Sequence, residues 1–470
     1  MSSLLRFLLP GVLFGIIAGS APAAPASAGQ NWPQWRGPLT NGLSPDGNPP
    51  VTWSETSNVK WKVKLPGKGS ATPIVWGDQI FIQTAIATGQ KAAATAEPPA
   101  APPPRPKGER AGGGPEGPGG KGGPGGRRGG GMGTATPTEP YQFVLLSLDR
   151  KTGKTQWQKT LQDVVPHEGH HATEGTFASA SPMTDGKSVF AFFGSRGLHC
   201  LDLQGNVKWQ KDFGRMRTKL TFGEGSSPVL FDDKIVLNWD HEGEDFVVAL
   251  DKTTGKELWR QSREEETSWG TPLVVTQDGT TQVITTATRK IRSYDLATGR
   301  LLWECAGMTA NSIPSPVAAD GLVFATSGFR GSALLAIKLD RSGDLTGTDA
   351  IAWSYKKNTP YVPSPLLYEG RLYFFALNNA TLTSCDAKTG RLLIDAHRFP
   401  EMQGVYASPV GASDRVYLVG RNGAATVIKL SDTLEVLATN RLDEKFDASP
   451  AIAGREMFLR GVEHLYCLAE

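Results

Sequence analysis

A serine-proline or threonine-proline pair recurs eight times in this 470-residue chain, and its spacing constrains the fold more than any other feature. The pairs are Thr72-Pro73, Ser181-Pro182, Ser227-Pro228, Thr271-Pro272, Ser315-Pro316, Ser364-Pro365, Ser408-Pro409 and Ser449-Pro450. From the second pair onward the spacing is 41 to 49 residues, the range of one four-stranded β-propeller blade. The longer first interval holds an insertion. The spacing therefore predicts eight copies of one structural unit.

Each repeat has the same internal order. A short apolar strand follows the proline, and a turn such as Gly77-Asp78 leads to a second strand. The third strand ends in Leu-Asp or a variant, and the fourth carries a tryptophan. Period-two runs of β-branched and aromatic residues between such turns are typical of strands.

The turn between the third and fourth strands has the most specific pattern, D-x-x-T-G followed four residues later by Trp. It occurs at 149–157, 251–259 and 295–303, and at 386–394 with isoleucine in place of Trp. The aspartate can hydrogen-bond the turn backbone, and the glycine accepts a positive φ that other residues resist. The tryptophan can cover apolar surface between neighbouring blades.

The two ends of the array complete each other. The last repeat stops after its third strand, whereas residues 58–61 (Asn-Val-Lys-Trp) precede the first pair and are identical to 206–209, the fourth strand of the second repeat. We therefore expect an all-β, eight-bladed β-propeller of four-stranded antiparallel blades over residues 58–470. The N-terminal strand completes the last blade, so the closed ring leaves no unpaired sheet edge.

The A-x-D-x-x-T-G-x-x-x-W pattern resembles the tryptophan-docking repeat of the PQQ-like (quinoprotein-type) β-propeller family, over roughly residues 58–470. Residues 31–38 (Asn-Trp-Pro-Gln-Trp-Arg-Gly-Pro) resemble the opening of exported, largely uncharacterised members. The family includes quinoprotein alcohol dehydrogenases and the barrel-assembly lipoprotein of the bacterial outer membrane. The resemblance thus implies the fold, and it leaves an enzyme and a binding protein open.

Residues 1–28 have the pattern of a secretory signal peptide: Arg6, an apolar run, and small residues up to Ala28. The run contains Pro10 and is short for a membrane span, although an uncleaved anchor is the alternative. No cysteine lies near the expected cleavage site for a lipid anchor. We expect a periplasmic or secreted protein with no stable membrane span after signal removal. The formal net charge of +3 gives no case for a nucleic-acid partner.

Two further segments are set apart. Residues 29–57 form an N-terminal extension, and residues 86–139 interrupt the first blade between its second and third strands. This insertion is rich in Ala, Pro and Gly, so we expect it to be disordered. Glycine at every third position from 114 to 129 also permits a collagen-like interpretation, but the run is short and lies inside one blade.

The cysteines do not suggest a disulfide framework. Cys200, Cys385 and Cys467 are assigned to one repeat position, where Ala249 stands in another repeat. A position taken by both Ala and Cys is typical of a small buried site.

The sharpest polar cluster is His167-Glu168-Gly169-His170-His171, in the loop from the first to the second blade. It matches H-E-x-x-H, which binds zinc only on a helix, and Pro166 with Gly169 indicates a loop. The cluster could hold a metal or an anion; alternatively, its members make local hydrogen bonds. Strand parity places this loop on the face opposite the D-x-x-T-G turns.

Other candidate ligand-binding residues share that face. Basic residues follow the second strand of several blades, joined by an acidic and a histidine residue in the third blade: Arg196, Arg289, Arg330, Arg421, Arg460, Asp240 and His241. The arginines could bind carboxylates or phosphates, or could pair with neighbouring acids and carbonyls. Trp269, just before Thr271-Pro272, could form a stacking floor for a planar ligand, or could serve packing.

Two classes of function follow. A PQQ-dependent alcohol dehydrogenase, as the resemblance implies, uses calcium with oxygen ligands, an aspartate base and a stacked quinone. It also uses a vicinal Cys-Cys pair and in some members a C-x-x-C-H haem site, and this sequence has neither. We therefore expect a non-catalytic binding or scaffolding protein of the cell envelope, without PQQ or calcium. Its expected partner is an envelope protein or peptide; a small ligand in the central channel, such as a saccharide, is an alternative.

Overall fold

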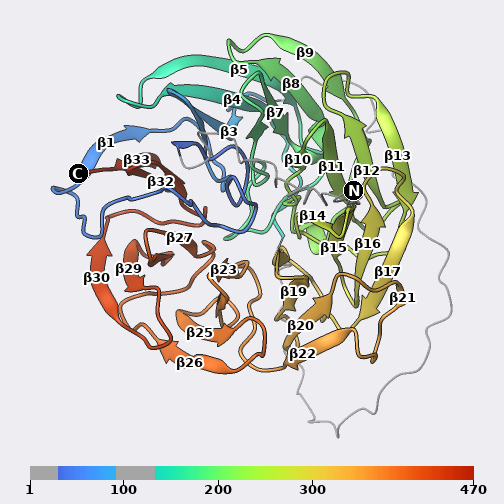
Figure 1. The fold of residues 1–470 in the computed structure, drawn as a ribbon. Helices are drawn as coiled ribbons and strands as arrows, with labels where there is room; N and C mark the ends of the chain where they lie inside the picture. The colour runs from blue at the N-terminus through green and yellow to red at the C-terminus, as the bar shows by residue number, and fades with distance from the viewer. Residues whose placement is uncertain (1–29, 92–132) are drawn as a thin grey trace, which may run out of the picture.

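The computed structural model describes residues 30–91 and 133–470, and they form eight antiparallel sheets arranged as a ring around a central channel (Figure 1). Each sheet is a meander in which strands that follow one another in the chain are hydrogen-bonded neighbours. The first strand of each blade lies innermost and the fourth lies at the rim. The predicted eight-bladed all-β propeller is confirmed.

The strand bounds of the first four blades are as follows. Blade 1 contains β2 (Ile74–Trp76), β3 (Gln79–Ala87), β4 (Tyr141–Asp149) and β5 (Thr155–Val164). Blade 2 contains β6 (Met183–Thr184), β7 (Ser188–Phe192), β8 (Leu198–Asp202) and β9 (Val207–Lys211). Blade 3 contains β10 (Val229–Phe231), β11 (Lys234–Trp239), β12 (Phe246–Asp251) and β13 (Glu257–Ser262). Blade 4 contains β14 (Leu273–Gln277), β15 (Thr280–Thr286), β16 (Lys290–Asp295) and β17 (Leu301–Ala306).

The other blades follow the same order. Blade 5 contains β18 (Val317–Ala319), β19 (Leu322–Ser327), β20 (Ala333–Lys338) and β22 (Ile351–Tyr355). Blade 6 contains β23 (Leu366–Tyr368), β24 (Arg371–Phe375), β25 (Thr381–Asp386) and β26 (Leu392–Arg398). Blade 7 contains β27 (Val410–Ala412), β28 (Arg415–Val419), β29 (Ala424–Lys429) and β30 (Val436–Arg441). Blade 8 contains β31 (Ala451–Ala453), β32 (Glu456–Arg460), β33 (His464–Leu468) and β1 (Val59–Lys64).

Two departures from a pure four-stranded pattern occur. The short strand β21 (Gly343–Asp344) pairs in parallel with β17 and gives blade 4 a fifth strand. Two short 3-10 helices, η2 (Gly194–Arg196) and η3 (Lys219–Thr221), lie in loops on the candidate-site face.

The ring closes as the sequence predicts. Strand β1 pairs antiparallel with β33, with Lys62 opposite Tyr466, and becomes the fourth strand of blade 8. In Figure 1 the blue β1 therefore lies beside the red β32 and β33.

The D-x-x-T-G turns have the expected geometry and an additional role. In the first of them, Asp149 accepts hydrogen bonds from the backbone N–H (2.9 Å) and the hydroxyl (2.7 Å) of Thr152. Gly153 has a φ of 70°, and a Cβ there would lie 2.8 Å from the ring of Trp61 in the preceding blade. The indole N–H of Trp61 donates to the carbonyl of Arg150 in the same turn (3.0 Å). The tryptophan of one blade thus docks on the glycine turn of the next.

The Ser/Thr-Pro pairs form a hydrogen-bonded ring around the channel. In seven of the eight pairs the backbone N–H of the Ser or Thr donates to the side-chain hydroxyl of its counterpart in the next blade. These bonds run from Thr72 to Ser181, Ser181 to Ser227, Ser227 to Thr271, Thr271 to Ser315, Ser315 to Ser364, Ser364 to Ser408 and Ser408 to Ser449, at 2.9–3.1 Å. The Thr72 hydroxyl then closes the circle by donating to the Ser449 carbonyl (3.2 Å). We call this the hydroxyl ring.

The N-terminal extension crosses the inner strands on the face of the D-x-x-T-G turns. Trp32 pairs with Val75 of blade 1, and the Pro33 carbonyl accepts from the backbone of blade 2. The Gln34 amide oxygen accepts from blade 3, and Arg36 donates to carbonyls in blades 6 and 7. Residues 30–57 thereby span one end of the channel.

Cysteine placement corrects one prediction. Cys200 and Cys467 lie opposite a fourth-strand tryptophan, the position that Ala249 takes in blade 3. Cys385 lies one residue further along its strand, and Ser384 occupies the shared position. The prediction for Cys385 is wrong because blade 6 ends its third strand in Ser-Cys-Asp, where blade 3 has Ala-Leu-Asp. All four cysteines are buried and free.

Two sequence predictions fall partly or wholly outside the described residues. The signal peptide (1–28) and most of the insertion expected at 86–139 lie there, so disorder of the insertion stays a prediction. The described parts show that β3 continues to Ala87 and that β4 begins at Tyr141. None of the helices in residues 30–91 and 133–470 has the length and apolar character needed to span a bilayer.

Candidate functional site

The central channel contains a cavity of about 640 Å3, and the repeat phase determines its wall. Every blade contributes the residue two positions before its Ser/Thr-Pro pair: Ser70, Ser179, Gly225, Trp269, Ile313, Val362, Tyr406 and Asp447. Trp35 of the extension also lines the cavity, so the extension forms its floor. The open mouth therefore lies on the face where the sequence placed the candidate residues.

Aromatic side chains form much of the wall and stay partly exposed. They are Trp35, Phe222, Trp269, Phe329, Tyr361 and Tyr406. The indole N–H of Trp269 donates to the Gly223 carbonyl (2.8 Å), so the polar edge of this ring is already satisfied by the protein. Phe329 and Tyr361 stack with their centroids 5.0 Å apart. By contrast, the largest aromatic residues of the core, such as Trp239 and Tyr417, are less than 2 % exposed.

Three carboxylates line the cavity, and each is ion-paired with a cation that does not. Asp447 pairs with both Nε (2.5 Å) and Nη2 (3.1 Å) of Arg421. Glu174 lies 3.8 Å from Nη1 of the same arginine. Glu224 lies 3.8 Å from Nη1 of Arg196. Among the described residues of the lining there is no lysine or arginine.

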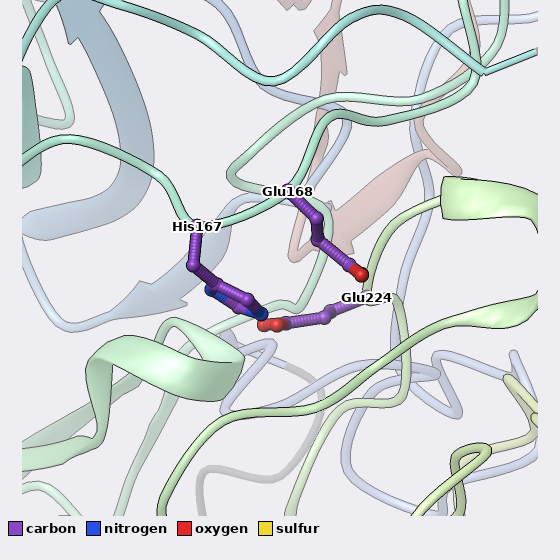
Figure 2. Close-up of side chains that lie close together, drawn as sticks. All are labelled: His167, Glu168 and Glu224. Carbon is purple, nitrogen blue, oxygen red and sulfur yellow. The ribbon is translucent and has the colours of Figure 1, made fainter. Parts of the chain in front are cut away.

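His167, Glu168 and Glu224 form the one group in the described residues whose ligand atoms lie close enough together to hold a metal, within 4.8 Å of one another. Figure 2 shows the side chains of His167 and Glu224 meeting end to end, with Glu168 beside them. The sequence predicted the histidine and the first glutamate from one loop; Glu224 comes from the loop between blades 2 and 3.

The guanidinium of Arg196 already lies against the cluster of His167, Glu168 and Glu224. Nη1 of Arg196 lies 3.1 Å from Nδ1 of His167 and 3.8 Å from Glu224. Since arginine only donates, His167 Nδ1 accepts, and its Nε2–H donates to the Met216 carbonyl (2.6 Å). His167 is therefore a neutral imidazole with both nitrogens in use, and burial lowers its pKa. A metal ion here would have to displace these bonds and lie beside the Arg196 charge.

The two glutamates are also bound by the protein. Glu168 accepts from the backbone N–H (3.1 Å) and hydroxyl (2.5 Å) of Thr218, and burial raises the pKa of its carboxyl to about 7. Glu224 accepts from the backbone N–H (2.7 Å) and the hydroxyl of Ser195. The cluster thus ties the loops of blades 1, 2 and 3 together.

The other two histidines of the motif have separate environments. The His170 ring packs edge-on against Phe177, and its Nδ1 lies 2.9 Å from the His171 carbonyl. His171 lines the channel cavity, with Nδ1 3.8 Å from a Glu174 carboxylate oxygen. The motif forms no helix, as its glycine and proline predicted.

Asp240 and His241 are buried in blade 3. Asp240 makes a two-point ion pair with Arg263 (2.7 and 3.1 Å), and neither side chain is exposed. Arg263 also donates to Thr285 and Tyr294 of blade 4. The His241 ring lies 3.0 Å from the Glu244 carbonyl. These contacts join blades 3 and 4.

None of the predicted arginines belongs to the lining of the cavity. Arg289 is 80 % exposed and lies 3.3 Å from Glu266, and Arg330 packs over Phe329. Arg421 covers the Tyr406 ring at 3.8 Å, and Arg460 is buried and donates to the carbonyls of Ala71 and Gln83. The paired arginines make the intramolecular contacts that the alternative interpretation described.

Sequence reasoning missed several lining residues. Asp447 and Val362 could have been found, because they share the repeat position that drew attention to Trp269. Phe222 and Phe329 lie in loops without a common phase, so no repeat signal marked them. Trp35 lies in the extension, which has no counterpart in the repeat.

Comparison with known proteins finds a family model that matches part of the chain. Residues 243–469 match the family model described as outer membrane protein assembly factor BamB. Comparison with curated proteins gives no match.

Three solved structures illustrate the range of similar propellers. Quinohemoprotein alcohol dehydrogenase from Comamonas testosteroni is 10 % identical with a TM-score of 0.59, over 94 % of this chain and 81 % of that one. A europium-containing methanol dehydrogenase is 11 % identical with a TM-score of 0.55, over 93 % and 90 %. BamB from Moraxella catarrhalis is 12 % identical with a TM-score of 0.51, over 71 % and 94 %. At these identities the likeness is one of fold alone.

Proposed function

We propose that this chain, a PQQ-like β-propeller, is an exported binding protein of the cell envelope that has no catalytic activity and receives its ligand through the open mouth of the channel. The N-terminal signal-peptide pattern supports export. The matched family model describes an outer membrane assembly factor, which supports an envelope protein or peptide as the partner.

The observation that carries the proposal is the state of the charged groups around the mouth. Two candidate acid–base residues, His167 and Glu168, are bound by other groups of the protein: His167 by Arg196 and Met216, and Glu168 by Thr218. A general acid or base needs an open position toward its substrate. These groups instead hold loops in place, which is what a preformed binding surface requires.

The alternative is a quinoprotein dehydrogenase, which the fold likeness favours. PQQ is a polycarboxylate, and the described lining offers it three carboxylates and no lysine or arginine. Calcium takes several oxygen ligands. The oxygens of Glu168 and Glu224 already accept hydrogen bonds, and Arg196 lies beside them. The residues present therefore do not fit the quinone and its calcium.

The test is to incubate the purified protein with PQQ and calcium and to follow quinone absorbance after gel filtration, together with dye-linked oxidation of a panel of primary alcohols. We expect no co-eluting quinone and no dye reduction above the rate without protein. Stoichiometric quinone with turnover would contradict the proposal. A parallel crosslinking experiment in intact cells should give a reproducible envelope partner.

A further inference from the structure

We propose that the channel cavity binds a short, uncharged carbohydrate; this inference rests on the proposed binding function and specifies its ligand. Three independent properties of the wall lead to it: exposed aromatic faces, unused hydroxyl donors, and carboxylate acceptors whose charge is neutralised from behind.

The aromatic faces supply the apolar part of the site. Six aromatic residues line the cavity, and all of them are partly exposed. Because the indole N–H of Trp269 is used internally, this side chain offers its ring to the channel and not its donor. The face of an aromatic ring carries negative partial charge, and the C–H groups along one side of a pyranose ring carry small positive partial charge, so the two surfaces pack favourably.

The hydroxyl ring supplies donors. Six of its members line the cavity: Thr72, Ser227, Thr271, Ser364, Ser408 and Ser449. The Thr72 hydroxyl already donates to the Ser449 carbonyl, whereas the hydroxyl oxygen of each of the other five accepts a backbone N–H from the neighbouring blade. In the described part of the chain none of the five hydroxyl protons has an acceptor, and a hydroxyl carries one donor beside its lone pairs. The wall therefore presents a circle of O–H groups that can donate to ligand oxygens.

The carboxylates supply acceptors without a net charge. Glu174, Glu224 and Asp447 face three cations that are not themselves part of the lining, namely Arg421, Arg196 and Lys445. A carboxylate has about four lone-pair positions. Glu174 and Asp447 can therefore still accept from ligand O–H groups, whereas both oxygens of Glu224 already accept from Ser195. Because each negative charge has its counter-charge, neither an anion nor a cation gains much from this wall. A ligand dense in both O–H donors and oxygen acceptors, with apolar C–H faces, satisfies all three properties.

The shape of the cavity limits the size of the ligand. Its 640 Å3 falls within the range of small-ligand sites, about 300–1,000 Å3. Trp35 lines the cavity and belongs to the extension that spans one end of the channel, so we expect the ligand to enter from the other end. A short saccharide, or the end of a longer glycan, suits this single mouth.

The test uses isothermal titration calorimetry with neutral trisaccharides (maltotriose, cellotriose, mannotriose and N-acetylated chitotriose). Trigalacturonate and the deacetylated glucosamine trimer serve as charged counterparts. We expect saturable binding of at least one neutral trisaccharide and at least tenfold weaker binding of the charged ones. Trp269→Ala should lower affinity at least tenfold, and Trp269→Phe should restore part of it. Tyr355→Ala, a half-exposed aromatic on the outer strand β22, is the matched control and should bind as the wild type does.

The outcomes distinguish a failure of the carbohydrate proposal from a failure of the proposed binding function. Absence of binding by every neutral sugar at millimolar concentration, with a folded protein, would overturn the carbohydrate and leave the binding function standing if an envelope protein is still captured. Equal loss of affinity in the Trp269 and Tyr355 variants would also overturn it. Consumption of a bound sugar would instead contradict the non-catalytic function.

Discussion

At the closed end of the channel the N-terminal extension buries its polar side chains against backbone N–H and carbonyl groups of the blades, whereas at the open mouth charged side chains pair with one another and stay partly exposed. Arg36 illustrates the first region: it is 2 % exposed, and its guanidinium donates to the carbonyls of Pro365, Pro409 and Asn41 at 2.7–2.8 Å. Burial without an acidic partner lowers its pKa to about 9. Glu174 illustrates the second region: Nη1 of Arg421 and Nδ1 of His171 each lie 3.8 Å from one of its carboxylate oxygens.

This difference separates residues that hold the ring together from residues that can meet a ligand. Removing a contact at the closed end should cost stability and leave the mouth unchanged. Removing a lining group at the mouth should change binding and leave stability nearly unchanged. The predictions below test this division.

The largest effect should come from Asp240, which lies near the mouth but is fully buried, as the polar residues at the closed end are. Asp240→Ala leaves the Arg263 guanidinium buried without its carboxylate, and breaking such a pair costs about 3–5 kcal/mol. Urea unfolding should show this loss. Asp240 would belong with the ligand-contacting residues if the variant kept its stability and lost ligand binding.

At the closed end, Arg36→Met should lower the free energy of unfolding by about 2–3 kcal/mol, because three buried carbonyls lose a charged donor. Arg289→Ala is the matched control; its side chain is 80 % exposed, so the change should stay within about 0.5 kcal/mol. An equal effect of the two variants would remove the distinction between the ends.

The burial of Glu168 makes the free energy of unfolding depend on pH. Its carboxyl has a pKa of about 7 in the folded protein against an ordinary value of 4.5, so the folded state holds the proton more tightly than the unfolded state. Stability should therefore fall as pH rises from about 4.5 to about 7. Glu168→Gln keeps an acceptor for Thr218 without ionising.

The variant should thus match the wild type near pH 4.5 and exceed it by about 3 kcal/mol above pH 7. Denaturant unfolding at a series of pH values measures the difference. A difference that does not change with pH would show that Glu168 ionises equally in both states.

A single link of the hydroxyl ring should contribute less. Ser408→Ala removes the acceptor for the buried N–H of Ser364, which should cost about 1–2 kcal/mol. Thermal unfolding would detect it as a lowered Tm. Ser342→Ala is a control at an exposed position and should leave Tm nearly unchanged. A lowered Tm in both variants would mean that a serine of the hydroxyl ring contributes no more to stability than an exposed serine does.

The smallest stability effect should come from the mouth itself. Glu174→Gln keeps the shape of a side chain whose ion pairs are long and partly exposed, so unfolding should change by less than about 0.5 kcal/mol. The same variant should change ligand affinity. A large loss of stability would place Glu174 with the structural residues.

The sequence was sufficient for the parts of the molecule that repeat. The phase of the Ser/Thr-Pro pairs predicted the eight blades, and the identity of 58–61 with 206–209 predicted the closing strand. The hydroxyl ring could not be predicted from them, because the partner of Ser364 is a residue of the next blade whose register only the fold defines. The same phase located Trp269 in the channel wall.

Contacts made by residues outside the repeat pattern could not be predicted from the sequence. Arg36 has no counterpart in any blade, so nothing in the sequence indicated that it would be buried against blades 6 and 7. Glu224 comes from a different loop than His167, and only the fold brings them together. Cys385 shows the limit within a repeat, since a shift of one residue in a strand changes which side of the sheet a side chain faces.

The pairing of β1 with β33 also affects the order in which the protein folds. These strands are roughly 400 residues apart in sequence, and contacts of such separation form late because the loop between them must first be closed. The last blade needs both ends of the chain, and the floor of the cavity comes from the segment just before β1. Until both ends of the polypeptide have come together, it has no complete cavity. The ability to bind should therefore be acquired in one late step, after the final strand has arrived.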